Sequence, residues 1–198
     1  DGYIQFMREL SVMCRKNGIV LSVDVPVPMD FTAHYNRKAL GEVCDYLMIM
    51  GYDEHYAGSE EAGTVASLSF EEEGIQNTLQ EVAAEKVVSG IPFYTRLWCT
   101  TTNEDGTTTV TSEAMGMNQA QQTLENNQVE ASWDETTGQN YAQFNGESGE
   151  LYQIWLEDTE SLTRKLELIK NYDLGGVAEW KLGLEDDSVW DLIAKYIS

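Results

Sequence analysis

Basic residues are scarce in this chain. Only 12 of its 198 residues are Lys or Arg, against 34 Asp and Glu, so the formal net charge at pH 7 is −22. Nucleic acids and anionic lipid surfaces are bound through Lys and Arg, and a chain of this charge repels both. The charge therefore argues against a nucleic-acid-binding or membrane-surface protein. A neutral partner such as a sugar is compatible with it, and solubility alone also accounts for much of the acidity.

Cysteine is rare and long apolar runs are missing. Cys14, Cys44 and Cys99 are far apart and form no CxxC pair, which excludes a disulfide framework and the usual zinc spacing. We therefore expect no metal and no cofactor, and we expect Cys14 and Cys44 to be small core residues. No segment approaches the ~20 apolar residues that span a bilayer, so membrane insertion is not expected. No secretory signal opens the chain, and we expect its first residue to be a boundary within a longer protein.

The chain contains enough apolar residues to form a packed core. It also contains one unusual strand pattern. Hydrophobic residues make up 42 % of the chain and aromatic residues 10 %. The apolar run Tyr46–Met50 is typical of a strand buried in a parallel sheet, and it ends abruptly at Gly51, Tyr52, Asp53 and a Glu-His pair. In α/β barrels the chemistry lies at the C-terminal ends of such strands. The alternative is an ordinary polar loop after a core strand.

The first half of the chain alternates between helical and strand patterns. The predicted helices lie in residues 3–14, the second half of 31–43, and 69–86, the last opened by a capping box, Ser69-Phe-Glu-Glu72. The predicted strands are residues 19–25, 46–50 and 86–94. This alternation predicts parallel strands joined by right-handed crossovers.

The composition then changes, and the following segment is rich in Thr, Asn, Gln and Gly. We predict a small α+β insertion there, with strands at 107–111, 131–134, 139–145 and 151–156 and a helix at 118–126. The α/β pattern returns with a helix capped by Asp158, a strand at 174–180 and a helix at 187–197. The expected division is an α/β part, residues 1–95 and 156–198, and an insertion domain, residues 96–155.

Several motifs in this order resemble glycoside hydrolase family 18, the chitinase-like (β/α)₈ barrels, and especially its bacterial cell-wall and spore-cortex hydrolases. Met50-Gly-Tyr-Asp53 is similar to the family's MxYD signature on strand six. The other matching segments are Leu21-Ser-Val-Asp-Val-Pro26 (strand five), Gly90-Ile-Pro-Phe-Tyr-Thr-Arg-Leu-Trp98 (strand seven), Trp155-Leu-Glu-Asp158, Ser161–Lys165 and Gly175-Gly-Val-Ala-Glu-Trp180 with Leu182-Gly183 (strand eight). The resemblance covers nearly the whole chain.

The resemblance implies strands 5–8 of a TIM-type barrel, with the α+β insertion between strands 7 and 8. It also implies a C-terminal portion of a hydrolase acting on β-1,4-linked N-acetylglucosamine polymers, in chitin or peptidoglycan. The family reaction is substrate-assisted, because the sugar's own N-acetyl group attacks its anomeric carbon. The family's DxxDxDxE motif on strand four supplies the general acid, a Glu that this chain lacks. We therefore expect this portion alone to be inactive.

Roles for individual residues follow from the same resemblance. Tyr52 is expected to hydrogen-bond the N-acetyl group, and Asp53 to stabilise the positive charge of the intermediate. Trp180 is expected to form the floor of the sugar subsite, while Tyr94 and Arg96 line the leaving-group side. For each of them a structural role is the alternative: core packing, a turn cap, or for Arg96 an ion pair with a nearby acid.

Met50 and Asp24 complete the expected substrate-binding set, since both belong to strands that end at the same mouth. Glu54 and His55 are expected to support the motif, and His34 to be a surface or capping residue. Glu179 is expected to point toward the helices rather than to replace the missing acid.

The alternatives are a non-catalytic carbohydrate-binding protein on the same fold, or an interaction surface in a larger envelope protein. The expected partner is a glycan that contains N-acetylglucosamine, and the expected location is extracellular or in the cell envelope. Half a barrel leaves two open strand edges, which predicts self-association.

Overall fold

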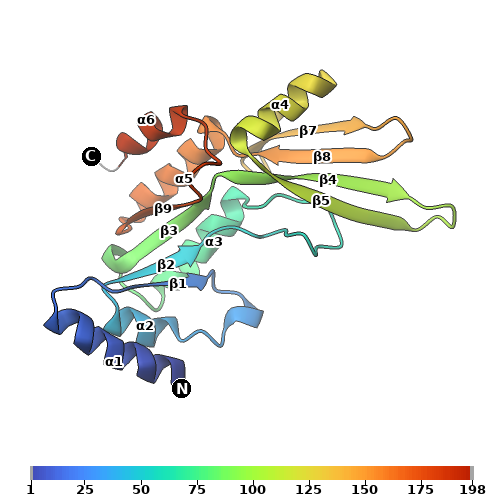
Figure 1. The fold of residues 1–198 in the computed structure, drawn as a ribbon. Helices are drawn as coiled ribbons and strands as arrows, with labels where there is room; N and C mark the ends of the chain where they lie inside the picture. Colours follow the sequence, from blue (N-terminus) through green and yellow to red (C-terminus); the bar gives the residue numbers. More distant parts are fainter. Residues whose placement is uncertain (1, 197–198) are drawn as a thin grey trace.

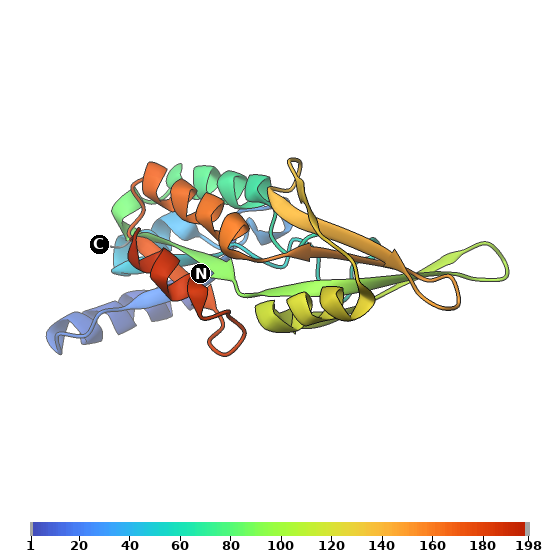
Figure 2. The ribbon, with the colours of Figure 1, turned by 90° about the horizontal axis from the view of Figure 1, so that it is seen from above.

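A parallel sheet forms one half of the molecule. The computed structural model describes residues 2–196 (Figures 1 and 2). The sheet has the order β1-β2-β3-β9, and all neighbouring strands are parallel, so the α/β alternation predicted from the sequence is confirmed. Its strands are β1 (Ser22–Pro26), β2 (Tyr46–Met50), β3 (Val87–Pro92) and β9 (Gly176–Trp180). The helical elements of this half are α1 (Gly2–Lys16), η1 (Asp30–Thr32), α2 (Arg37–Val43), α3 (Leu68–Leu79), η2 (Ala84–Lys86), α5 (Thr159–Asn171) and α6 (Ser188–Ala194).

The helices pack on one face of this sheet (Figure 1). Because side chains alternate along a strand, each strand sends every second residue toward them. Val25, Leu47, Ile49 and Val87 are almost fully buried there, together with Ile75 of α3. A second cluster continues this core toward α5 and α6, and its buried members are Ile91, Phe93, Met117, Leu162, Leu166, Ile169, Val189 and Ile193.

The opposite face of the sheet is only partly covered. Asp24 and Tyr46 are exposed, Met48 and Met50 are half-buried, and Trp180 is 53 % exposed. The register places Asp24 beside Met48, so these side chains share one face and lead toward the C-terminal edge of the sheet. This face and this edge are where a site would be accessible.

An antiparallel sheet forms the other half and extends away from the first (Figure 2). Its order is β5-β4-β8-β7-β6, and helix α4 packs on it over a small core of its own. The bounds are β4 (Tyr94–Thr102), β5 (Thr108–Gly116), α4 (Met117–Asn127), β6 (Ser132–Asp134), β7 (Gln139–Asn145) and β8 (Leu151–Leu156). Only Phe93 separates β3 from β4, so the chain passes directly from one sheet into the other.

Several sequence-based expectations need correction. The segment 19–21 is not part of β1, and β4 was not predicted. Helix α3 begins at Leu68 and ends at Leu79 rather than near residue 86, and its cap is Ser67, whose hydroxyl accepts from the Phe70 amide, rather than Ser69. The closing helix ends at Ala194, and residues 197–198 lie outside the described part of the chain.

Other expectations are confirmed. The bounds of β7 and β8 are those predicted, and Asp158 caps α5 by accepting from two backbone amides. Cys14 and Cys44 are buried.

A buried cluster of charged and polar side chains lies between the two halves. Lys165 of α5 lies 2.6 Å from Glu157 and 3.1 Å from Glu71 of α3, and all three side chains are fully buried. Gln139 of β7 donates to Glu157 at 2.7 Å. Trp98 of β4 adds a further link, since its indole N–H donates to the carbonyl of residue 63 at 2.7 Å. These contacts fix the antiparallel sheet against α3, α5 and the loop that follows β2.

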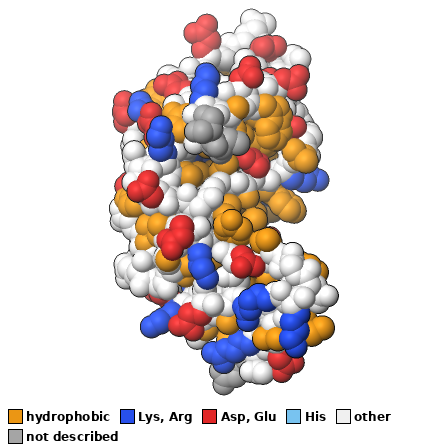
Figure 3. Space-filling view, turned by 90° about the vertical axis from the view of Figure 1, so that its left-hand side faces the viewer, with side chains coloured by type: hydrophobic (Ala, Val, Ile, Leu, Met, Phe, Trp, Pro, Cys, Tyr) orange, Lys and Arg blue, Asp and Glu red, His pale blue; other side chains and the backbone are white. Residues whose placement is uncertain are grey.

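The half of the molecule that contains the parallel sheet carries exposed apolar residues on its surface. In the view of Figure 3, apolar side chains lie in the middle of the face, and most Lys and Arg side chains lie in its lower part. Large exposed apolar residues of α1 and the turn after it are Tyr3, Phe6, Val12, Met13, Ile19 and Val20. No helix within residues 2–196 is long and apolar enough to cross a membrane. Strands β1 and β9 are the two edges of the parallel sheet, so self-association through them stays a prediction.

Candidate active site

The turn after β2 places Tyr52 and Asp53 at the C-terminal edge of the parallel sheet. Gly51 donates its backbone N–H to the carbonyl of Gly90 at 2.9 Å, and a Cβ on Gly51 would lie 2.7 Å from that same oxygen. Only glycine fits such a close approach between two strands. Asp53 then has a positive φ of 62°, a conformation that Asp tolerates better than most residues. The backbone thus turns sharply directly after β2.

Four of the residues singled out from the sequence lie together at this edge. The Tyr52 ring lies 6.5 Å from the Trp180 ring with an interplanar angle of 25°, and 6.2 Å from the Tyr94 ring in an edge-on arrangement. The Tyr94 hydroxyl donates to the Asp53 carboxylate at 2.5 Å. Tyr52 and Asp53 follow the end of β2, Trp180 ends β9, and Tyr94 begins β4 directly after β3. They meet because the parallel strands β2, β3 and β9 all end at one side of the sheet. Trp180 is followed by a cis peptide bond to Lys181, and its carbonyl accepts from the Phe93 amide at 2.8 Å.

Both tyrosines are held in the neutral form. Burial raises the pKa of Tyr52, and the negative charges of Asp24 and Asp53 raise it further. Burial likewise raises the pKa of Tyr94, and its hydrogen bond to Asp53 adds to the increase. Because a neutral phenol keeps its proton, each tyrosine remains a hydrogen-bond donor over the whole physiological pH range. Tyr94 donates this proton to Asp53. The Tyr52 hydroxyl makes no hydrogen bond within residues 2–196, so it is available to a ligand.

Two cavities flank this group of side chains. One of about 530 Å³ lies on the β1 side and is lined by Met50, Tyr52 and Asp53 among others. The second, of about 310 Å³, lies on the side of the antiparallel sheet and is lined by Tyr94, Arg96 and Trp180, again with Asp53. Asp53 therefore faces both cavities. Asp24 lines neither of them and lies exposed on the open face of the sheet.

Sequence reasoning missed several residues that line these cavities. Phe31 and Tyr56 are 73 % and 55 % exposed beside the larger cavity, where aromatic rings would suit the apolar face of a sugar. Gln119 of α4 and Leu184 line the smaller one. Aromatic residues in the loops after β1 and β2 were the available signal. Which residues lie beside them in the folded protein could not be inferred from the sequence.

The remaining candidates have structural roles in the described part of the chain. Glu54 accepts from the backbone N–H and the hydroxyl of Ser67, and so fastens the loop after β2 to the start of α3. A ring nitrogen of His55 lies 2.9 Å from the carbonyl of Thr64 within the same loop. His34 is exposed, as expected for a surface histidine, and its ring lies 4.4 Å from the Tyr35 ring in a tilted arrangement.

Glu179 is half-buried on β9, and burial raises the pKa of its carboxyl. The register puts it beside Ile91, on the face that packs against the helices.

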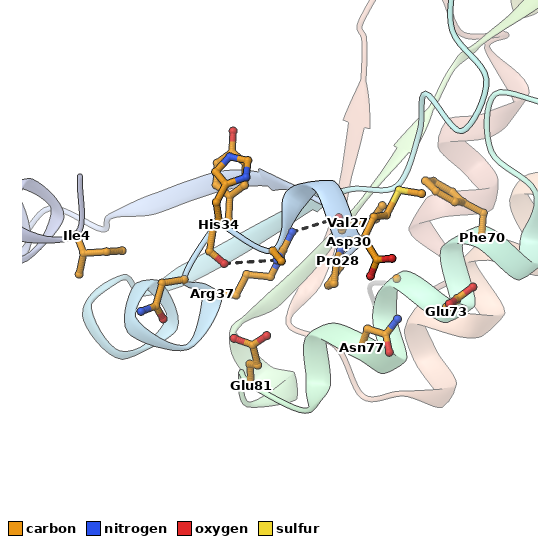
Figure 4. Close-up of a pocket in the computed structure, with 15 residues that line it drawn as sticks. Ile4, Val27, Pro28, Asp30, His34, Arg37, Phe70, Glu73, Asn77 and Glu81 are labelled. Atoms are coloured by element: carbon orange, nitrogen blue, oxygen red, sulfur yellow. Dashed lines mark hydrogen bonds between the residues drawn. The ribbon is translucent and has the colours of Figure 1, made fainter. Parts of the chain in front are cut away.

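A larger cavity, of about 810 Å³, lies elsewhere, between η1, α2 and α3 (Figure 4). Arg37 lines this cavity, and its guanidinium group is buried and donates to the carbonyls of Pro26, Val27 and Thr32. Arg37 therefore braces the loop after β1. The cavity contains none of Tyr52, Asp53, Tyr94 or Trp180, so size alone does not identify the site.

The sequence profile of Glycosyl hydrolases family 18 matches residues 1–185. The chain belongs to this family. The match spans the parallel sheet and the insertion together, so the family resemblance inferred from the motifs is confirmed.

Similar proteins agree with this assignment. The chain is 26 % identical over 200 residues to the cortical fragment-lytic enzyme of Bacillus subtilis (strain 168), covering 98 % of this chain and 46 % of that protein. It is 26 % identical over 179 residues to human di-N-acetylchitobiase, covering 81 % of this chain and 46 % of that protein. The crystal structure of a chitinase from Chromobacterium violaceum ATCC 12472 superposes with a TM-score of 0.86 at 25 % identity, covering 99 % of this chain and 61 % of that one. The chain thus spans about half the length of the two enzymes matched by sequence.

Proposed function

We propose that this chain forms part of a glycoside hydrolase that cleaves β-1,4 bonds in N-acetylglucosamine polymers, in chitin or peptidoglycan. The observation that carries the proposal is the convergence of Tyr52, Asp53, Tyr94 and Trp180 at one edge of the parallel sheet. We further propose that β1, β2, β3 and β9 are strands 5–8 of a (β/α)₈ barrel, whose open face becomes the barrel interior. Family membership and the parallel order of the strands support this.

The proposed mechanism is substrate-assisted. The acetamido oxygen of the sugar would attack the anomeric carbon of the same residue, forming a cyclic oxazolinium ion and releasing the leaving oxygen. Tyr52, with its hydroxyl free and its pKa raised, would donate a hydrogen bond that holds the acetamido group for attack. Asp53 would stabilise the positive charge of the intermediate, and Tyr94 would hold the Asp53 carboxylate in place through their hydrogen bond.

Trp180 would form the platform under the reacting sugar. More than half of its surface is exposed, although it is a large aromatic residue at the end of a core strand. Stacking of a pyranose ring would cover this apolar surface. Met50 would line the neighbouring cavity on the β1 side.

Protonation of the leaving oxygen requires an acid that we assign to a Glu outside these 198 residues. The DxxDxDxE motif does not occur in the sequence. Glu179 lies on the helix-packed face of the sheet and is not a replacement. An extracellular or envelope location is proposed with the substrate, since chitin and peptidoglycan are found there.

The test uses the full-length natural protein and chitotetraose. Tyr52→Phe should lower kcat/KM by about 100-fold or more, because it removes one directed hydrogen bond in the transition state. A chitotetraose that lacks the N-acetyl group on the reacting sugar should not be cleaved, and the product of the normal substrate should retain the anomeric configuration. Cleavage of the deacetylated sugar at the normal rate, or inversion of configuration seen by NMR, would contradict the mechanism.

A carbohydrate-binding protein without catalysis is the second candidate, and the exposed Trp180 platform favours it. A single measurement, whether product forms from chitotetraose, distinguishes this candidate from the hydrolase. Chitotetraose would bind to the full-length protein in calorimetry with a loss of affinity in Trp180→Ala, but no product would form. Turnover by the wild-type protein would reject this candidate.

A further inference from the structure

A short path of contacts leads from the buried charge cluster to the candidate active site. Glu157, which lies 2.6 Å from Lys165, directly follows strand β8. Two residues before it, the Trp155 carbonyl accepts a hydrogen bond from the Thr95 hydroxyl. Thr95 is the neighbour of Tyr94 at the start of β4. The cluster therefore helps to set where the Tyr94 phenol lies, although its three charged residues line neither cavity of the site.

The same cluster touches the other side of the site through Glu71. A Cβ on Gly51 would lie 3.3 Å from the Cγ of Glu71, so this side chain packs against the turn that carries Asp53. The turn is held to the parallel sheet by its own bond, from the Gly51 amide to the Gly90 carbonyl. Glu71 therefore lies at the junction between the Asp53 turn and the sheet that carries its partner, Tyr94.

The two carboxylates of the cluster share one ammonium unequally. Glu157 accepts hydrogen bonds from Gln139 at 2.7 Å and Ser161 at 2.9 Å as well as from Lys165, whereas neither oxygen of Glu71 has a hydrogen-bond partner. Burial raises the pKa of Glu71 from 4.5 to about 8, although Lys165 lies 3.1 Å away. The cluster therefore keeps one proton on Glu71 at neutral pH and loses it as the pH rises past about 8.

Ionisation of Glu71 would change the balance of the cluster. Among residues 2–196, Lys165 of α5 is the cation that acts on Glu71, while Glu157 and Glu54, in the loop after β2, are both acidic. Strand β3 also packs on α3 and has no titratable side chain. A buried carboxylate requires a cation or hydrogen-bond donors, so an ionised Glu71 would compete with Glu157 for Lys165. This competition would weaken the contact that holds the end of β8.

We propose that the buried charge cluster positions the Tyr94 phenol against Asp53, and that ionisation of Glu71 shifts β8 and β4 so that this contact lengthens and the activity falls. The three charged residues of the cluster are thus positioning residues, which act on the reaction through Tyr94. The effect on activity rests on the proposed function, in which Tyr94 holds the carboxylate that faces the intermediate. The effect on Tyr94 itself requires no substrate.

A titration without substrate tests the structural step in the full-length natural protein. Tyrosine labelled with ¹³C at Cζ is incorporated, and the Tyr94 signal in the NMR spectrum is assigned with Tyr94→Phe. In wild type this signal should move between pH 6 and pH 9 with a midpoint near 8, where Glu71 ionises. The phenol itself stays protonated in this range, because burial and its hydrogen bond to Asp53 raise its pKa. In Glu71→Gln, which has no proton to lose, the signal should stay in place.

Further variants complete the titration. Glu71→Met also removes the ionisable group, and it repeats the test if circular dichroism shows that Glu71→Gln does not fold. Glu73→Gln, at an exposed position on the same helix, removes a charge outside the cluster and should titrate as wild type. Thr95→Val removes the hydroxyl that binds the Trp155 carbonyl, so the movement of the Tyr94 signal should become smaller. A Tyr94 signal that does not move in wild type, or that moves equally in the Glu71 variant, would overturn the inference.

Activity on chitotetraose tests the functional step. With a pKa of about 8, roughly one tenth of the wild-type protein keeps the Glu71 proton at pH 9. Between pH 7 and pH 9 the kcat of wild type should therefore fall several-fold more than that of Glu71→Gln, up to about 10-fold, and groups that titrate in both proteins cancel in this comparison. KM should change by less than about 2-fold, because Asp53 and Tyr94 act on the charge of the intermediate. Equal falls in kcat, or a change confined to KM, would contradict the inference.

The proposed function and this inference can fail separately. If chitotetraose is not cleaved, the proposed function fails, and the titration without substrate still decides whether Glu71 controls the position of Tyr94. If chitotetraose is cleaved while the Tyr94 signal does not respond to Glu71, the inference fails and the proposed function stands.

Discussion

The buried charge cluster between the two sheets leads to a prediction about stability. The effect of replacing Glu71 on the free energy of unfolding should depend on pH. One ammonium, Lys165, serves two carboxylates, at 2.6 Å for Glu157 and 3.1 Å for Glu71. Glu157 also accepts hydrogen bonds from Gln139 and Ser161, whereas Glu71 accepts none. The proton of the cluster therefore resides on Glu71, and burial raises the pKa of this carboxyl from 4.5 to about 8 despite the nearby Lys165.

The direction in which stability changes with pH follows from the linkage between protonation and folding. Above pH 4.5 the unfolded chain loses the Glu71 proton while the folded chain keeps it, so the folded state binds more protons and loses stability as the pH rises. The loss continues until the pH reaches about 8, where the folded carboxyl also ionises. At ~1.4 kcal/mol for each pKa unit, the whole effect is on the order of 5 kcal/mol.

Glu71→Gln is the informative substitution, because glutamine resembles the protonated acid. The free energy of unfolding of the variant should be within about 1 kcal/mol of wild type at pH 5. At pH 9 the wild-type carboxylate is charged and poorly paired, so the variant should be the more stable protein. Its advantage should grow by roughly 4 kcal/mol between the two pH values.

Urea unfolding followed by circular dichroism at pH 5, 7 and 9 measures this difference. Glu73→Gln, at an exposed position on the same helix, controls for the removed charge and should show no such trend. Lys165→Met should destabilise the protein at neutral pH by ~3–5 kcal/mol, because Glu157 would remain buried without its cation. If Glu71→Gln is less stable than wild type at pH 9, Glu71 is ionised in the folded protein and the proton assignment is wrong.

Two further predictions concern how the site is held. Trp98→Phe removes the indole N–H that binds the carbonyl of residue 63, and should cost ~1–3 kcal/mol and accelerate hydrogen exchange in residues 51–67; unchanged exchange there would show that Trp98 does not hold this loop. Gly51→Ala places a Cβ 2.7 Å from the carbonyl oxygen of Gly90 and should cost ~1–3 kcal/mol in thermal unfolding. Gly176→Ala, in the same sheet but with nothing within 4 Å, is its matched control and should be tolerated, so equal losses at both positions would refute the steric argument.

The sequence was most informative where one residue pattern decides the structure. The apolar run Tyr46–Met50 predicted β2 with its correct bounds, since a strand buried on one face and half-buried on the other admits few polar residues. The grouping of Tyr52 with Trp180 was predictable for a related reason. Parallel strands end at a common edge, so residues far apart in the chain meet there once the strand ends are known.

The sequence was least informative where distant contacts decide the structure. Strand β4 follows β3 after a single residue, and although its Tyr, Trp and Thr residues favour a strand, nothing in the sequence marks Phe93 as the point where the chain passes into a second sheet. Glu71 was predicted only as part of the capping-box segment that opens a helix, yet it is fully buried against Lys165. A lysine on the apolar side of α5, among Leu162, Leu166 and Ile169, was the available signal, but its partners lie 8 and 94 positions away in the chain.

The site depends on two sheets that share one continuous stretch of chain. Tyr52 and Trp180 belong to the parallel sheet, whereas Tyr94 and Arg96 belong to β4 of the antiparallel sheet. Because only Phe93 separates β3 from β4, the direction in which β4 leaves β3 sets where the guanidinium lies relative to the Trp180 platform. Contacts outside the site, those of the buried Lys165 cluster and of Trp98, support that direction together with the Tyr94–Asp53 hydrogen bond. Loosening the cluster should therefore disturb the position of Arg96, on β4, before that of Tyr52, on the parallel sheet.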